Sequence, residues 1–356
     1  MSADQGRPGG GTRGGGPVRA YVLRGPGEGG VEDIPAPVAG PGEAVIDVER
    51  VGLCGTDTEF FTGEMAYLQQ GHASYPMRLG HEWCGTVRAV GPGADPAWAG
   101  RRVMGDTMLG CGACRRCQRG HQHVCAQRTE VGVRGGRPGA LAEQVAVPVS
   151  SLHALPAGIG ETVGALVEPG ANALRAARAA RARPGERILV MGPGAIGSLV
   201  ALYLRADGAE VHLMGPRTGS AEFVRSLGFT HVWTQDTLPD LPFDAVVEAT
   251  NAADLPALAL DLVEPAGRVV YIGLAGRPSL IDTRVAALKD VTVTGILSGS
   301  GGIDAAIEAF AAPRVDPRPL VGATVTLGEV SEVLAGHRPP GAGLGPKIHV
   351  DPRAGS

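Results

Sequence analysis

The stretch RILVMGPGAIGSLVALYLRAD, residues 187–207, decides the fold of the chain. An apolar run at 187–191 leads into a G-x-G-x-x-G motif, which opens a helical pattern that continues to Asp207. This order of strand, glycine turn and helix is typical of dinucleotide binding, because the turn brings backbone N–H groups close to a pyrophosphate. The alternative is an ordinary glycine-rich loop. The predicted cofactor-binding positions are Gly192, Gly194, Ala195, Ile196 and Gly197.

The end of the next predicted strand, 210–214, bears on the choice of cofactor. An acidic side chain there would bind the adenosine ribose of NAD, whereas an arginine would accommodate the 2′-phosphate of NADP. The strand is followed by Gly215-Pro216-Arg217, so no carboxylate is present and Arg217 can pair with the phosphate. NADP is favoured, and Gly215→Asp is expected to shift the preference toward NAD. Alternatively Arg217 is a solvated loop residue and both NAD and NADP are used.

Composition excludes several classes of protein. The 356 residues leave room for two domains, and 44% hydrophobic with 19% charged residues is ordinary for a globular protein. A net charge of −4 argues against nucleic acid as a partner. The absence of a long apolar run and of a signal-peptide pattern argues against a membrane and for a cytoplasmic location. Residues 1–17 have almost no apolar side chains to bury, only those of Met1 and Ala3, and are predicted to form a disordered tail.

Three stretches differ in pattern. Residues 18 to about 168 contain short apolar runs broken by glycine and proline, which favour a β-rich region. From about 169 to 299 helical patterns alternate with apolar strands, which indicates a parallel sheet covered by helices on both faces. The remainder, 300–356, predicts a helix and two more strands. The expected fold class is therefore α/β.

Four of the six cysteines form a C-x2-C-x2-C-x7-C cluster. In a chain without a secretion signal such a cluster more often holds a metal than disulfides, and four thiolates close a tetrahedral shell around a structural zinc. An iron–sulfur cluster is the alternative. His121 and His123 within the same loop are expected to be exposed. The predicted ligands of this structural site are Cys111, Cys114, Cys117 and Cys125.

Taken together, these motifs resemble those of the zinc-containing medium-chain dehydrogenases of the alcohol, polyol and threonine dehydrogenase type. The resemblance extends from Val18 to Val350. It rests on GLCGTD at 52–57, GHE at 80–82 and VEP at 167–169, together with the cysteine cluster and the glycine motif in the same order.

The resemblance implies a second, catalytic zinc. Cys54, His81 and Glu168 match the family's ligand positions, and Glu82 would be an alternating ligand. Asp57 would accept a hydrogen bond from the non-ligating nitrogen of His81 and so orient the ring. Its alternative role is that of a turn residue.

The remaining implied roles concern protons and phosphates. Thr56 matches the hydroxyl that passes the substrate proton outward, and Glu59 stands where many relatives carry a histidine that completes this route. A solvated Glu59 is equally compatible with the sequence. Lys347 resembles a basic position that reaches the cofactor phosphates, with a surface lysine as the alternative. Cys84 is expected to serve only in packing.

The resemblance also implies the architecture. A GroES-like, partly open β-barrel would comprise residues 18–168 and 300–356, with a Rossmann domain at 169–299 inserted between its two parts. Relatives pair through the Rossmann sheet as dimers or tetramers, so the edge strand at 291–296 is the expected contact between copies.

The leading functional hypothesis is a zinc-dependent, NADP-preferring dehydrogenase of a secondary alcohol, with a polyol, sugar or cyclitol as the expected substrate. The second is an NADPH-dependent carbonyl or imine reductase of a biosynthetic pathway, which the same residues would serve. The third is a non-catalytic zinc protein. It is disfavoured by the intact ligand set and by the negative net charge.

Overall fold

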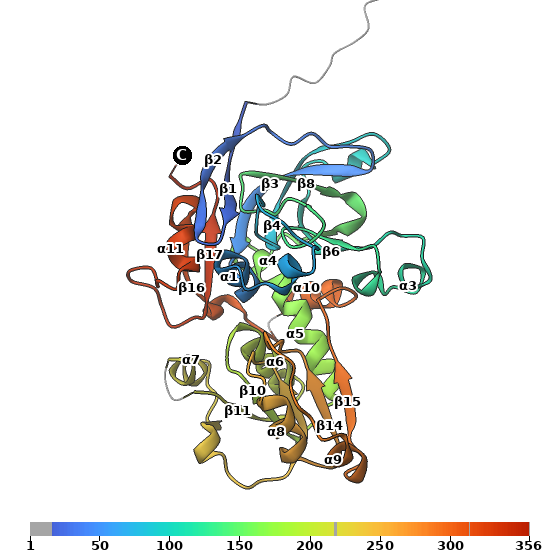
Figure 1. Cartoon of the computed structure of the whole chain (residues 1–356), viewed down its shortest axis with the longest axis vertical. Coiled ribbons are helices and arrows are strands. Elements are labelled where there is room, and N and C mark those ends of the chain that lie inside the picture. Colours follow the sequence, from blue (N-terminus) through green and yellow to red (C-terminus); the bar gives the residue numbers. More distant parts are fainter. Residues whose placement is uncertain (1–15, 217–218, 313, 356) are drawn as a thin grey trace, which may run out of the picture.

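The computed structural model describes residues 16–216, 219–312 and 314–355. The predicted tail, except its last two residues, and Arg217 lie outside these ranges. Two sheets organise the chain, the first in the upper part of Figure 1 and the second in the lower part. Among the described residues, no helix combines the length and the apolar character that a membrane span requires.

The first sheet is built from both ends of the chain. Its strands follow the order β16-β17-β3-β4-β5-β9, with β8 paired to β3. All its pairs are antiparallel except β16 with β17. A hairpin of β1 (Val18–Gly25) and β2 (Glu28–Ile34) lies beside it. The strands of the sheet are β3 (Glu43–Gly52), β4 (Glu82–Val90), β5 (Arg102–Gly105), β8 (Gln144–Pro148), β9 (Leu152–Ala154), β16 (Val321–Thr326) and β17 (Lys347–Asp351).

The second sheet is parallel throughout and has the order β12-β11-β10-β13-β14-β15. Counted along the chain from β10, this is the 3-2-1-4-5-6 order of doubly wound dinucleotide-binding sheets. The predicted parallel sheet is therefore confirmed, and the predicted strands at 187–191 and 210–214 are found at those residues. Its strands are β10 (Arg187–Met191), β11 (Glu210–Met214), β12 (Val232–Trp233), β13 (Phe243–Glu248), β14 (Val263–Tyr271) and β15 (Thr292–Gly295).

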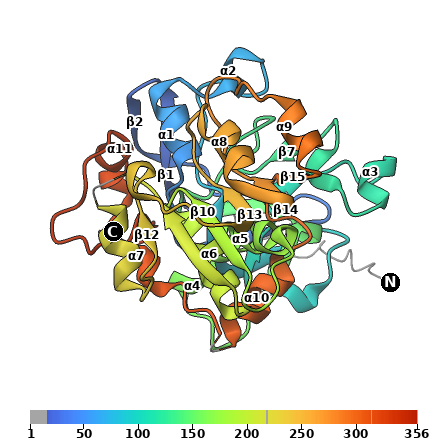
Figure 2. The same ribbon diagram turned by 90° about the horizontal axis from the view of Figure 1, so that it is seen from below.

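Helices cover both faces of the parallel sheet, as Figure 2 shows from below. Side chains alternate along each strand, so Ile188 and Val190 pack toward one face while Leu189 and Met191 pack toward the other. The first face is covered by α5 (Val167–Ala180) and α6 (Ala195–Ala206), and the second by α8 (Leu255–Leu262) and α9 (Thr283–Leu288). The remaining helices are α1 (Gly55–Thr62), α2 (Ala66–Gln69), α3 (Arg115–Gln118), α4 (Glu161–Ala165), α7 (Ser220–Ser226), α10 (Ile303–Ala311) and α11 (Val330–Leu334).

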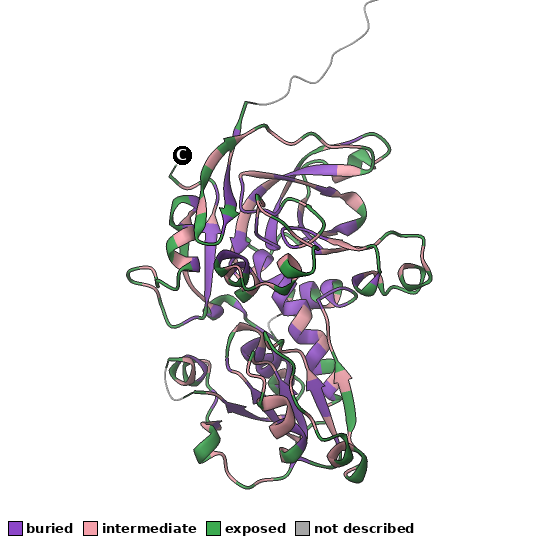
Figure 3. Ribbon diagram, viewed as in Figure 1, coloured by how far each residue is buried: buried purple, intermediate pink, exposed green. Residues whose placement is uncertain are grey.

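One hydrophobic core joins the two sheets through α5. The cluster that contains the α5 and α6 side chains also contains Cys84 of β4 and Met104 of β5. Figure 3 shows the buried residues continuing from the strands of both sheets into α5. Because α5 begins at Val167, Glu168 and Pro169 lie in its first turn, where proline is tolerated. The shared core therefore fixes the position of Glu168 relative to the first sheet.

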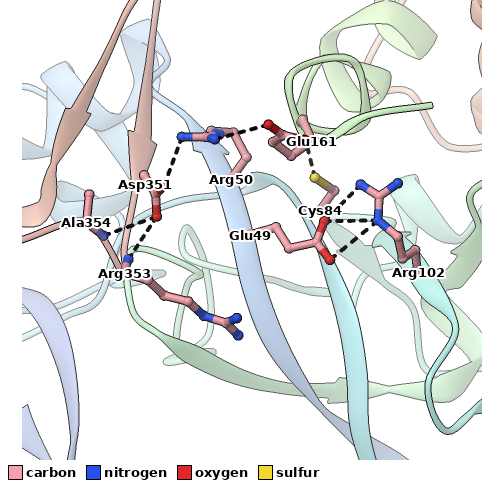
Figure 4. Close-up of polar contacts among 8 residues, drawn as sticks. All are labelled: Glu49, Arg50, Cys84, Arg102, Glu161, Asp351, Arg353 and Ala354. Atoms are coloured by element: carbon pink, nitrogen blue, oxygen red, sulfur yellow. Dashed lines mark hydrogen bonds and ion pairs between the residues drawn. The ribbon is translucent and has the colours of Figure 1, made fainter. Parts of the chain in front are cut away.

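Polar contacts hold the segment that precedes α5 against the first sheet (Figure 4). The Cys84 thiol donates to the carbonyl of Glu161 at 3.2 Å, and Arg102 binds the Glu49 carboxylate at 2.8 Å. Gly164 allows the close approach, since a Cβ there would lie 2.8 Å from the Cys84 sulfur. Burial raises the pKa of Cys84 to about 12, so it stays a neutral thiol. The packing role predicted for Cys84 is confirmed.

One sequence expectation about exposure is wrong. His123 is only 7% exposed, and its ring meets that of His121 edge-on, at 5.9 Å between centroids. The loop folds back on itself because its cysteines converge, which buries one of the two histidines and leaves the other outside.

His349 is a second buried histidine, located in the middle of β17. It is fully buried, and neither ring nitrogen has a hydrogen-bond partner among the described residues. Burial, together with the nearby charges of Lys347 and Arg50, lowers the pKa of His349 to about 3. The native protein therefore holds this ring neutral at pH values where the unfolded chain protonates it.

This difference predicts how stability depends on pH. Below about pH 6.5 the unfolded chain binds a proton that native His349 does not, so stability falls by up to about 1.4 kcal/mol per pH unit until the native pKa is reached. In urea unfolding between about pH 7 and about pH 5, His349→Leu should flatten this decline. His337→Leu, at an exposed site, is the matched control and should leave it unchanged. Equal pH slopes for His349→Leu and wild type would contradict the assignment.

Candidate active site and zinc centres

The four clustered cysteines converge on one point. Their sulfur atoms all lie within 4.8 Å of one another, with 3.6 Å between Cys114 and Cys117 and 3.8 Å between Cys114 and Cys125. A zinc ion with Zn–S bonds of about 2.3 Å places its thiolates about 3.8 Å apart at the corners of a tetrahedron. A multi-iron cluster would need its thiolates spread around a larger core. The arrangement therefore fits a single tetrahedral ion, and these four residues would hold it.

Backbone donors favour thiolates in this lobe, defined as residues 111–125. The N–H of Cys114 lies 3.4 Å from the sulfur of Cys111, and the N–H of Gln127 lies 3.4 Å from that of Cys125. Backbone N–H groups, that of Cys111 first, lower the pKa of Cys125 to about 6 despite desolvation. Desolvation raises the pKa of Cys117 to about 11, so the backbone favours the thiolate, the form that binds metal, at Cys125 but not at every cysteine of the lobe.

A second group of potential ligands lies where the first sheet meets α1 and α5. Ligand atoms of Cys54, His81 and Glu82 lie within 4.8 Å of one another. His81 and Glu82 are buried, and Cys54 precedes α1. A thiolate, an imidazole and a carboxylate together form a donor set that suits zinc. The structure thus brings together three of the four predicted catalytic-zinc ligands around one point.

The fourth predicted ligand, Glu168, lies beside this group but outside the 4.8 Å set. Its Oε1 accepts a hydrogen bond from Asn172 Nδ2, one helical turn further along α5, at 3.0 Å. Burial raises the pKa of Glu168 to about 7, with His81 opposing the increase and the negative charge of Glu82 adding to it. The two carboxylates are therefore close enough to influence each other.

Asp57 connects the segments that carry the ligands. Its carboxylate is fully buried and accepts hydrogen bonds from the N–H of Cys54 at 2.9 Å and from that of Gly80 at 3.3 Å. Its Oδ1 lies 3.6 Å from Nδ1 of His81. Burial lowers the pKa of His81, and the Asp57 charge more than compensates, so the net change is upward. Asp57 therefore lies close to the His81 ring, as the resemblance implies, but its carboxylate accepts its hydrogen bonds from backbone N–H groups.

Lys347 occupies a different place from the one expected. Its Nζ lies 2.5 Å from both carboxylate oxygens of Glu82 and donates to the carbonyl of Leu53 at 3.0 Å. The side chain is buried, which excludes the surface-lysine alternative, and these contacts direct its charge to Glu82. Desolvation opposes this charge, yet the Glu82 carboxylate raises the pKa of Lys347. The lysine is therefore a counterion within the ligand group.

The two residues predicted to carry protons both lie on α1. Thr56 is half-buried next to Cys54, and Glu59 is on the exposed side of the helix. Partial desolvation and the nearby Glu64 raise the pKa of Glu59. The exposure of Glu59 agrees both with a solvated surface carboxylate and with a group that passes a proton to solvent.

The glycine motif forms a close-packed turn between β10 and α6. Gly192 has φ +90°, and a Cβ there would lie 2.7 Å from Cγ2 of Thr250. A Cβ on Gly197 would lie 2.0 Å from the carbonyl oxygen of Gly192, whereas Gly194 faces open space. α6 begins at Ala195 without a side-chain cap, so its first N–H groups are available to an anion. These residues, with half-buried Ala195 and Ile196, fit the pyrophosphate of a dinucleotide.

Sequence reasoning missed a buried hub at Asp106. Its carboxylate accepts hydrogen bonds from Ser300 Oγ at 2.8 Å and from Gln122 Nε2 at 3.2 Å, and the adjacent Thr107 donates to the carbonyl of His81 at 3.2 Å. This hub ties the cysteine lobe to the segment that returns from the parallel sheet. No local pattern marks it. Asn172, by contrast, stands four residues after Glu168, and this spacing places both side chains on one face of a helix, so their contact could have been predicted from the sequence.

A third group of potential ligands, Glu210, His212 and His231, does not fit a metal. The indole N–H of Trp233 donates to Nδ1 of His212 at 3.0 Å, so the proton of the neutral ring is on Nε2. That nitrogen contacts Glu210 Oε1 at 2.8 Å. His212 therefore has no lone pair left to offer, and the group is a hydrogen-bonded part of the core.

Comparison with known proteins agrees with this geometry. Residues 40–157 match the family described as the alcohol dehydrogenase GroES-like domain, and residues 195–312 match the family described as zinc-binding dehydrogenase. A 2-dehydro-3-deoxy-L-galactonate 5-dehydrogenase of Pseudoalteromonas atlantica is 31% identical over 308 residues, covering 83% of this chain and 87% of that protein. An L-threonine 3-dehydrogenase of Rhizobium etli is 30% identical over 277 residues, covering 75% and 79% respectively.

A crystal structure gives the same result for the fold. A putative zinc-binding dehydrogenase from Sinorhizobium meliloti, bound to NADP, has a TM-score of 0.84 and 25% identity, and the match covers 94% of this chain and 99% of that one. The predicted combination of a GroES-like domain with a doubly wound nucleotide-binding domain is thereby confirmed. The chain belongs to the zinc-type medium-chain alcohol dehydrogenase family and is an oxidoreductase that acts on CH–OH groups.

Proposed function

We propose that the protein oxidises a secondary alcohol of the polyol, sugar or cyclitol class to a ketone, reversibly, with NADP as its preferred cofactor and two zinc ions per chain. The convergence of Cys54, His81 and Glu82, with Glu168 beside them, is the observation that carries this proposal. The names of the two relatives denote dehydrogenation at carbon 5 of a sugar acid and at carbon 3 of threonine, which supports an inner hydroxyl as the reacting group.

The catalytic ion would be held by Cys54, His81 and Glu168, with Glu82 as the alternating ligand. Bound there, zinc would supply Lewis-acid stabilisation of an alkoxide, so that an alcohol loses its proton near neutral pH. Glu82 is already paired with Lys347, which favours Glu168 as the resting ligand. Asn172 holds the Glu168 carboxylate by one oxygen, and Asp57 holds the backbone next to Cys54 and His81.

The proton leaves through α1 in this proposal. Thr56 follows Cys54 by two residues at the start of the helix, where its hydroxyl can accept the substrate proton and donate its own onward. Glu59 stands one helical turn later, on the exposed side, and can pass the proton to solvent. Hydride transfer to the nicotinamide completes the oxidation, and the cofactor itself supplies that chemistry.

The cofactor preference rests on the residues immediately after β11. Gly215 offers no carboxylate to the ribose, and Arg217, outside the described residues, supplies a positive charge two positions later. The Sinorhizobium meliloti structure was solved with NADP, which supports the same choice. The reverse reaction, a carbonyl reduction with NADPH, would use the same residues.

Metal analysis tests the two-zinc assignment. Wild type should contain two zinc ions per chain. Cys54→Ser should retain one and lose turnover, because the catalytic shell is broken. Cys114→Ser should lose the other and be destabilised by ~3 kcal/mol or more, since a structural zinc contributes directly to folding. Cys84→Ala, which removes a cysteine outside both groups, is the control and should keep both ions. A wild-type protein with a single zinc ion per chain would contradict the two-zinc assignment.

A substrate panel tests the reaction. We expect nicotinamide absorbance to change with polyols, sugars or cyclitols, with kcat/KM about tenfold or more higher for NADP than for NAD. Arg217→Ala should weaken NADPH binding by about tenfold and leave NADH binding nearly unchanged. Primary alcohols serve as the comparison. Turnover of these alone, or none with any alcohol or ketone in either direction, would refute the proposed substrate class.

We also propose that two copies pair along β15. This strand is one of the two edges of the parallel sheet, and Val293 on it is 45% exposed. Leu274, Leu280 and Leu288, from the segments next to it, are each more than 70% exposed. An edge strand with unpaired backbone groups beside exposed leucines is suited to β-pairing with a second copy.

Light scattering tests this interface. Val293→Lys places a charge on the edge and should shift the protein to monomers. Val38→Lys, which changes a valine that is still more exposed, at 80%, and lies next to the first sheet, should leave the oligomer intact. If both variants keep the wild-type mass, copies do not pair through β15.

A further inference from the structure

Gly215 and Pro193 lie in contact at the ends of neighbouring strands. A Cβ built on Gly215 would lie 2.4 Å from Cδ and 2.5 Å from Cγ of Pro193, far closer than real side chains approach. Gly215 does not have a positive φ, so this position requires glycine for space and not for conformation. The end of β11 therefore has no room for any side chain while Pro193 is present.

Neither residue can easily move away. β10 and β11 pair in parallel register, with Met191 opposite Met214. The N–H of Gly192 donates to the carbonyl of Met214 at 2.8 Å, and the N–H of Gly215 donates to the carbonyl of Trp233 at 3.0 Å. The proline ring is buried and its φ is fixed by its own covalent geometry. Separating the pair would break hydrogen bonds at the strand ends.

This contact lies at the end of β11, which is the second strand of the sheet counted from the glycine motif. In dinucleotide-binding sheets an acidic side chain at the end of the second strand binds the ribose hydroxyl of NAD and repels the 2′-phosphate of NADP. Here that strand is β11, and its end is occupied by a ring that belongs to the glycine motif of the first strand. The ring therefore fills the position from which an acidic side chain would reach the adenosine end of a bound cofactor.

We propose that Pro193 is a determinant of cofactor specificity, because its ring takes the space that a carboxylate at residue 215 would need. The inference rests on the NADP preference proposed above. It changes the expectation drawn from the sequence. Gly215→Asp alone would force its side chain into Pro193, so it would disrupt the site instead of converting it. Conversion toward NAD requires both positions to change.

Four variants test the coupling: Pro193→Ala, Gly215→Asp, the double variant P193A/G215D, and P193A/G215N as an uncharged control of nearly equal size. Tm of the cofactor-free protein reports packing, and titration with NADPH and NADH gives the two Kd values. Gly215→Asp should lower Tm by at least about 3 °C and weaken both cofactors. P193A/G215D should recover most of the lost Tm.

The double variant should also favour NADH, with the ratio of Kd for NADPH to Kd for NADH at least about tenfold above that of Pro193→Ala. P193A/G215N should recover Tm but exclude NADPH less, since it lacks the charge. A Gly215→Asp protein with wild-type Tm, or a double variant no more stable than Gly215→Asp, would overturn the steric coupling. A stable double variant with an unchanged Kd ratio would overturn the role in specificity. A wild type that binds NADH as tightly as NADPH would instead contradict the proposed NADP preference itself.

Discussion

The active site depends on one buried charge, the carboxylate of Asp57. It accepts hydrogen bonds from the N–H of Cys54 and from the N–H of Gly80, the residue before His81, and so links two separate segments of the chain. Asp57 thereby holds the main chain at Cys54 and next to His81, so the Cys54 sulfur and a His81 ring nitrogen stay available to a metal. Because Asp57 lies in the first turn of α1, the helix N-terminus also stabilises its charge. An apolar residue there would leave both N–H groups without this acceptor.

Further charged groups lie around the ligands, and only some of them are compensated by a partner of opposite charge or by a hydrogen bond. Two buried carboxylates, Glu82 and Glu168, lie close together, and the charge of Glu82 adds to desolvation in raising the pKa of Glu168. Lys347 neutralises Glu82 from the last strand of the chain, and Asn172 supports Glu168 from α5. The site is thus assembled from four distant segments, and it exists only when the C-terminal strand has joined the first sheet.

The sequence predicts local features well and distant pairings poorly. The strand, turn and helix around the glycine motif, and the convergence of the four cysteines, follow from spacing within about twenty residues, so both could be predicted. The partner of Lys347 lies on another strand, and the contact between Pro193 and Gly215 arises only when two strands pair. The burial of His123 likewise depends on how the lobe closes. Each of these three features depends on tertiary contacts, which the periodicity of apolar residues in the sequence does not encode.

The cysteines differ in a way that matters when the protein meets an oxidant. Cys84 stays a thiol inside the core, whereas backbone N–H groups lower the pKa of Cys125 and Cys111 is exposed. An oxidant in solution can reach Cys111, whereas the core encloses Cys84, so oxidation is expected in the cysteine lobe before the core. Because Asp106 accepts hydrogen bonds from Gln122 of that lobe and from Ser300 of the segment that returns from the parallel sheet, a change in the lobe would also disturb that segment. The lobe is thus the redox-vulnerable part of the molecule.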